Sequence, residues 1–124
     1  MKRLPDAELE VMMAIWELDR KVTRVEIEST LKRGGELSPT TILSMLSRLE
    51  KKCFVSVEKE GKQNVYEALV SQDEYLQAES RTVLEKMYNN SVTNFMMALY
   101  SGKKPSKKQL DELQELIDNF KEDK

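Results

Sequence analysis

Apolar residues recur at helical spacing in three stretches before residue 54. The first stretch begins at Asp6, a natural N-cap that follows Pro5, and it predicts a helix with one face toward the core. The stripe expected on that face has the spacing i, i+3, i+4 and i+7, and consists of Leu9, Met12, Met13 and Trp16.

The second and third stretches carry their own start and stop signals. Thr23 and Glu26 stand three residues apart, as in a capping box, and Gly34-Gly35 is expected to stop the helix. Ser38-Pro39 is an N-cap followed by proline at the first helical position, where the missing N–H costs nothing. The apolar residues expected to pack from these helices are Val25, Ile27 and Leu31, then Ile42, Met45, Leu46, Leu49 and Cys53.

After residue 53 the pattern changes to alternation. Residues 54–58 and 65–69 alternate between apolar and polar, and Glu60-Gly61-Lys62 between them is typical of a turn. Three helices followed by a β-hairpin is the element order of a winged helix-turn-helix. We therefore expect a mainly α fold with a small β-hairpin, in which residues 1–71 form a winged helix-turn-helix DNA-binding domain.

Residues 72–124 change character again and predict three amphipathic helices. Ser71 with Glu74 and Ser106 with Gln109 mark the first and last of them, while 89–91 and 102–105 interrupt the pattern. A segment this short buries little surface alone, so we expect a helical dimerisation region that shares its core with a second chain. The alternative is that this tail folds back onto residues 1–71. The side chains expected at the dimer interface are Leu76, Val83, Phe95, Met96, Leu99, Leu110, Leu113, Ile117 and Phe120.

The amino-acid composition excludes several classes of function. The chain has 20 Lys+Arg and 22 Asp+Glu, a net charge of −2, no histidine and one cysteine. Histidine-dependent triads and His–metal sites are excluded, and a lone Cys53 cannot form an internal disulfide or a CxxC site. With no glycine-rich phosphate loop or nucleophile motif, we expect no enzyme, no metal and no cofactor. No apolar run approaches the roughly 20 residues that span a bilayer, so we expect a cytoplasmic protein without membrane insertion.

The face of the third helix opposite its apolar residues carries small hydroxylated side chains. Such side chains let a helix approach the floor of the DNA major groove, and basic residues beside them suit phosphate. A merely solvated face is the alternative, but the order of elements favours DNA. The residues expected to contact DNA are Ser38, Thr40, Thr41, Ser44, Ser47, Arg48 and Lys51 on the helix, with Lys59 and Lys62 on the hairpin.

Two segments resemble a known family of bacterial transcriptional regulators. Residues 7–12 (AELEVM) with Ile15-Trp16 are similar to the first-helix signature of the penicillinase-repressor family, BlaI/MecI/CopY, and residues 38–52 to its recognition helix. The resemblance implies a homodimeric winged-helix repressor on palindromic operator DNA of β-lactamase or penicillin-resistance genes, or of its own operon. By position, it implies that Thr40, Thr41 and Ser44 face bases, and that Arg48, Lys51 and Lys62 face phosphates.

Three features depart from the family pattern. In the β-lactam branch a membrane sensor-protease pathway inactivates the repressor by cutting an Asn-Phe bond, whereas the aligned pair, the candidate cleavage region, is Ala98-Leu99. The tail lacks the cysteine cluster of the copper-responsive branch. Cys53 stands where the family usually has a glycine, which would suit a left-handed helix end.

Two other functions remain open from sequence. The same surface could hold a protein partner, making the chain a winged-helix protein–protein interaction module. The chain could also be a ligand-sensing regulator without proteolytic induction, with a pocket between the tail and the first domain.

Overall fold

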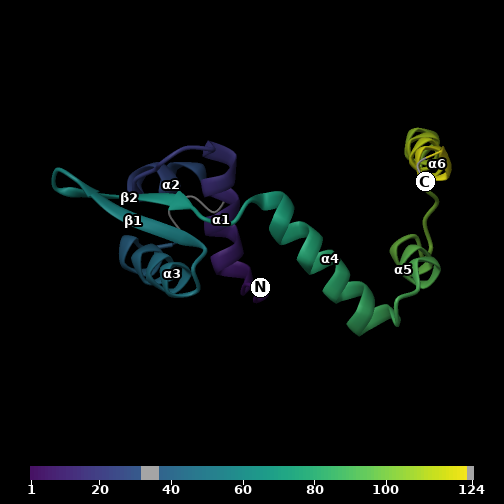
Figure 1. Ribbon diagram of the computed structural model, residues 1–124, viewed down its shortest axis with the longest axis horizontal. Helices are drawn as coiled ribbons and strands as arrows, with labels where there is room; N and C mark the ends of the chain where they lie inside the picture. The colour runs from purple at the N-terminus through teal and green to yellow at the C-terminus, as the bar shows by residue number, and fades with distance from the viewer. Residues whose placement is uncertain (32–36, 123–124) are drawn as a thin grey trace. The chain divides into compact units, whose positions relative to one another are not determined.

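The computed structural model describes residues 1–31 and 37–122. These residues form a mainly helical fold with one antiparallel hairpin, as expected (Figure 1). The elements are α1 (Asp6–Leu18), α2 (Arg24–Thr30), α3 (Pro39–Lys51), β1 (Val55–Glu60), β2 (Gln63–Ala68), α4 (Gln72–Tyr88), α5 (Val92–Leu99) and α6 (Lys107–Glu122). Within the described ranges, no helix is both long enough and apolar enough to cross a bilayer.

The chain divides into two compact units, residues 1–80 and 81–124. The first unit holds α1, α2, α3 and the hairpin around one core and includes the beginning of α4, so it extends past residue 71, where the sequence places the boundary. The predicted stop of the second helix at Gly34-Gly35 lies outside the described residues, and α2 itself ends at Thr30.

An isolated β-bridge, which the sequence pattern does not reveal, links the chain before α2 to the hairpin in the first unit. The N–H of Val22 donates to the carbonyl oxygen of Tyr66 at 2.9 Å, and the N–H of Tyr66 donates back at 2.7 Å. This single bridge fixes the chain just before α2 against β2. The arrangement of three helices and a small sheet is that of a winged helix-turn-helix.

The buried face of α1 differs by one residue from the predicted stripe. Glu8, Val11, Met12 and Ile15 are buried, whereas Met13 is 45% exposed and Leu9 and Trp16 are only partly buried. The spacing is the same, but a shift of one residue turns the helix face by about 100°. The prediction is confirmed for Met12 and wrong for Met13, because the first member of the true stripe is a charged residue. The start of α1 also differs, since Pro5 is its N-cap and Asp6 its first residue.

The ends of α3 are set by local hydrogen bonds. As predicted, Ser38 is the N-cap, and its Oγ accepts from the N–H of Thr41 at 3.1 Å. At the other end, the N–H of Phe54 donates to Leu49 and the N–H of Cys53 donates to Glu50, which is a Schellman motif. The four predicted core residues of α3 are buried, but Cys53 is exposed with a φ of 65°, so its predicted place on the apolar face was wrong.

Replacing Cys53 with glycine should raise the free energy of unfolding by about 0.5–1 kcal/mol. A side chain at this left-handed φ costs about 1–2 kcal/mol, which the glycine variant would recover. Part of that gain is offset because glycine has greater backbone freedom in the unfolded chain. Urea denaturation of the reduced protein measures the change. Cys53→Ala keeps the strain and removes the thiol, so an equal gain in that variant would contradict the backbone explanation.

The hairpin forms where the sequence predicts it. Val55 lies opposite Ala68 and Glu60 opposite Gln63, which leaves a two-residue turn. Gly61, first in that turn, has a φ of 66°, as type II′ hairpin turns require. The turn places Lys62 at the tip of the hairpin.

Tyr75 packs the beginning of α4 against the rest of the first unit. This side chain is 3% exposed, and its hydroxyl accepts a hydrogen bond from the N–H of Leu4 at 2.9 Å. Its ring lies 5.8 Å from the rings of both Trp16 and Phe54. Trp16 therefore packs within the fold, as expected, and its indole N–H donates to the carbonyl of Val70.

The second unit has well-formed helices but no buried residue between positions 81 and 122. The predicted cap at Ser106 is present, since its Oγ accepts from the N–H of Gln109, and the Oγ of Ser91, which was expected only to interrupt the pattern, accepts from the N–H of Asn94 in the same way. The rings of Tyr88 and Phe95 meet edge to face at 5.3 Å. More than 40% of the side chain is exposed at Leu99, Leu110, Leu116, Ile117 and Phe120. A single copy leaves this apolar surface uncovered.

Candidate nucleic-acid interface

The outward face of α3 is a strip of small polar side chains. Thr40, Ser44, Ser47 and Lys51 are all exposed on the side opposite the buried residues of the helix. Arg48 is exposed at the edge of the same strip. In Figure 1, β1 runs beside α3 and the hairpin turn projects beyond the helix. The structure thus provides an exposed helix surface without bulky side chains along its centre, next to a protruding hairpin.

Ser38 and Thr41 have a different role from the other hydroxyl residues. The Oγ of Ser38 lies 2.9 Å from the Oγ1 of Thr41, in addition to capping its N–H. Both hydroxyls are therefore used in holding the first turn of α3. Thr41 is also half-buried, unlike the other hydroxyl residues of the strip.

The hairpin lysines are exposed, as the sequence predicts. Lys59 faces Asn64 across the hairpin and Lys62 is in the turn. Glu58 lies on the same strand as Lys59, and its carboxylate is 3.5 Å from the ammonium of Lys21. This ion pair offsets one of the negative charges next to the hairpin lysines.

Lys52, which follows the strip directly in sequence, turns toward the core. Its Nζ lies 2.6 Å from the carboxylate of Glu8, which is 4% exposed. The pair joins α1 to the end of α3, and the lysine ammonium neutralises the buried carboxylate of Glu8. Sequence reasoning missed it because the two residues are 44 positions apart.

A second ion pair fixes the start of α2 beside the interface. The guanidinium of Arg20 lies 2.6 Å from the carboxylate of Glu26, which also accepts from the N–H of Thr23 in the predicted capping box. The hydrogen bond from Arg20, followed by that from Thr23, lowers the pKa of Glu26 to about 2.

The stability contributed by Glu26 should be lost in acid. Because its folded pKa lies below the usual value of 4.5, the contribution is complete above pH 4.5 and disappears as the pH falls toward 2. Urea denaturation of the wild type and of Glu26→Gln should therefore show a stability difference that shrinks across this range. A difference that stays constant from pH 6 to pH 2 would contradict the assignment.

Two apolar residues beside the strip were not predicted as surface residues. Val25 was expected to pack in the core but is 52% exposed, and Leu43, which the sequence analysis did not single out, is 43% exposed. They share a hollow of about 170 Å³ with residues from α2 and β2, namely Thr23, Arg24, Gln63, Asn64 and Tyr66. The sequence did contain a signal for the exposure of Leu43. It stands three residues after Thr40 and four before Ser47, which places it beside the strip on the helix surface.

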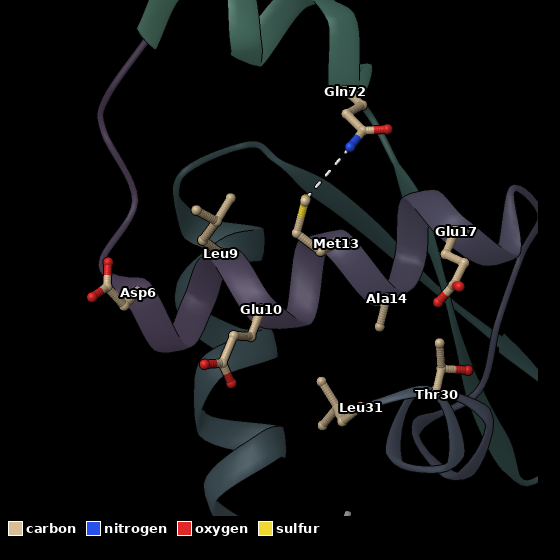
Figure 2. Close-up of a pocket in the computed structure, with 9 residues that line it drawn as sticks. All are labelled: Asp6, Leu9, Glu10, Met13, Ala14, Glu17, Thr30, Leu31 and Gln72. Atoms are coloured by element: carbon tan, nitrogen blue, oxygen red, sulfur yellow. Dashed lines mark hydrogen bonds between the residues drawn. The ribbon is translucent and has the colours of Figure 1, made fainter. Parts of the chain in front are cut away.

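A larger hollow of about 690 Å³ lies elsewhere on the first unit (Figure 2). Figure 2 shows Leu9 and Met13 on the side of α1 toward Gln72, whose amide N–H donates to the Met13 sulfur, and Ala14 on the side toward Leu31. Three carboxylates, of Asp6, Glu10 and Glu17, stand around it. This acidic rim is unsuited to DNA. Among the described residues, no group of three acidic or cysteine side chains is arranged to hold a metal ion.

A family model described as "Penicillinase repressor" matches residues 4–119. The chain belongs to the penicillinase repressor family. This confirms the family resemblance of the two sequence segments. Because members of the family are transcriptional repressors, the chain is a repressor and not an enzyme.

Relatives in this family match over nearly their whole length. The penicillinase repressor of Bacillus licheniformis is 31% identical over 124 residues, which cover 98% of this chain and 96% of that protein. The methicillin resistance regulatory protein MecI of Mammaliicoccus sciuri is 25% identical over 92% of both chains. The solution structure of the DNA binding domain of the repressor BlaI, 37% identical, has a TM-score of 0.51 and covers 60% of this chain and 94% of that one.

Proposed function

We propose that the protein represses transcription in the cytoplasm as a homodimer that occupies palindromic operator DNA. The observation that carries this proposal is the exposed strip of α3, with hydroxyl side chains at its centre, Arg48 and Lys51 at its end, and the hairpin lysines alongside. In this arrangement α3 enters the major groove, with Thr40, Ser44 and Ser47 toward the bases. Arg48, Lys51, Lys59 and Lys62 contact phosphates, while Ser38 and Thr41 hold the first turn.

The second unit supplies the dimer. Its apolar residues are uncovered in one copy, and a two-fold partner with the same surface would cover them. Each DNA-binding unit neutralises few phosphates, so each binds weakly alone. Two units linked at a matching spacing gain affinity through effective concentration, with half-sites one or two helical turns apart.

The regulated genes are of the kind named in the relatives, those of penicillinase or methicillin resistance. Induction acts on the tail, since weakening the dimer releases DNA without any change at α3. Ala98-Leu99, the candidate cleavage region, lies in the last turn of α5 with both residues exposed. A cut there by a membrane sensor-protease pathway would separate α6 from the rest of the chain.

Salt dependence of binding tests this proposal. Affinity for a duplex selected from a random pool should fall linearly with salt on logarithmic axes, because each contacted phosphate releases counterions. Arg48→Ala should reduce that slope by about 1 per contacted phosphate, and Arg81→Ala, an exposed arginine on α4 outside the interface, should leave it unchanged. Fluorescence anisotropy across a salt series measures both.

The alternatives give different results in the same experiment. A protein–protein module would show no selected duplex and no steep salt slope. A ligand-sensing regulator would bind DNA with the expected slope but would respond to a small molecule, and its induction would leave the chain intact.

A further inference from the structure

The surface beside the α3 strip contains two exposed apolar residues from different helices. Val25 on α2 and Leu43 on α3 line one hollow, although each lies among polar neighbours. Their exposed fractions, 52% and 43%, are large for residues so close to the core. Neither is needed to complete the core, since Ile27, two residues after Val25, and Ile42, directly before Leu43, are fully buried.

The chemistry of the hollow is unsuited to a phosphate. Among the described residues that line it, Arg24 is the one charged side chain, and its guanidinium pairs with Glu28 on the next turn of α2. Tyr66 also lines it but is buried, and its backbone N–H and carbonyl are hydrogen-bonded to Val22. What the hollow offers is aliphatic surface, bordered by the amides of Gln63 and Asn64.

The position of Leu43 places this surface at the edge of the DNA-facing strip. On α3 it is three residues from Thr40 and four from Ser47, so all three occupy neighbouring positions on the helix surface. The other exposed positions of the strip are polar. In the major groove, the 5-methyl group of thymine is the apolar feature that distinguishes one base from the others.

We propose that Leu43, supported by Val25, contacts the 5-methyl group of a thymine in each half-site and thereby selects that base. The inference rests on the proposed function, because it needs α3 to lie in the major groove. It assigns base selection to an aliphatic contact beside the hydroxyl strip.

Replacing thymine by uracil, which removes only the methyl group, provides the test. With the full-length protein and its selected duplex, single thymine-to-uracil changes should reveal a position in each half-site where affinity falls about threefold to fivefold, as expected for one lost methyl contact. Leu43→Ala should bind the thymine duplex more weakly by a similar factor and lose its preference for thymine over uracil there. Leu43→Met, which keeps an aliphatic side chain, should retain the preference.

Leu69→Ala is the matched control, since Leu69 is an exposed leucine of the same unit outside the interface. It should keep the full thymine preference. If Leu43→Ala still distinguishes thymine from uracil at every sensitive position, or if the wild type is insensitive throughout, the inference is overturned while the proposed function stands. If the wild type binds no duplex with a salt-dependent affinity, the proposed function fails first.

Discussion

Replacing Leu113 and Ile117 together by aspartate should weaken operator binding by at least about 100-fold while leaving the helices intact. Both residues lie on the apolar face of α6, and Ile117 is 45% exposed in the single chain, so the substitutions disturb little within it. In a dimer each copy would bury two carboxylates without partners, which disfavours association strongly. Loss of the dimer removes the gain from linking two units, which ranges from about 100-fold to 10,000-fold.

Sedimentation and DNA binding, measured on the same samples, test whether loss of the dimer and loss of operator affinity occur together. Lys108→Gln with Asn119→Asp lowers the charge of α6 by the same two units on the opposite face, and this variant should remain dimeric and bind as the wild type does. Circular dichroism checks that helix content is preserved. A monomeric double-aspartate protein that still binds its operator at wild-type affinity would overturn the dimer mechanism.

Lys52→Met should lower the free energy of unfolding by about 3 kcal/mol. The substitution keeps most of the aliphatic stem but removes the ammonium that lies 2.6 Å from Glu8. A carboxylate that is 4% exposed is then left without its partner, and breaking a buried pair in this way costs about 3–5 kcal/mol. The lower end applies because the lysine side chain is 27% exposed. Thermal or urea unfolding measures the change.

The double variant Glu8→Leu with Lys52→Met is the control for this pair. Because it removes both charges, it should regain most of the lost stability. If it is as unstable as Lys52→Met alone, the cost lies in packing and not in the unpaired charge. Since Lys52 faces α1, the folded Lys52→Met protein should also keep the wild-type salt slope on DNA, which separates it from Arg48 and Lys51.

The features predicted correctly from the sequence are those whose cause lies within a few residues. The caps at Thr23, Ser38 and Ser71 each depend on a partner three residues away, and the structure shows those hydrogen bonds. The hairpin follows from alternation around Gly61. Local signals of this kind were sufficient to predict the fold class and the outward strip of α3.

Several of the missed features depend on residues far apart in the chain. The true face of α1 requires Glu8 to be buried, which makes sense only once Lys52 lies beside it. The bridge between Val22 and Tyr66 and the burial of Tyr75 likewise require the tertiary fold. The exposure of Leu43 and Val25 was missed for the opposite reason, because helical spacing alone does not reveal which apolar residues the core leaves out.

The contact of Tyr75 with Leu4, Trp16 and Phe54 has a consequence for biosynthesis. The hydroxyl of Tyr75 and the N–H of Leu4 are 71 positions apart, so the ribosome must release almost the whole first unit before its earliest residues find their final neighbours. A nascent chain that stalls just after the hairpin lacks this aromatic residue, and Trp16 and Phe54 then lose a ring that packs against both. The first turns of α4 must therefore be translated before the first unit can complete its packing.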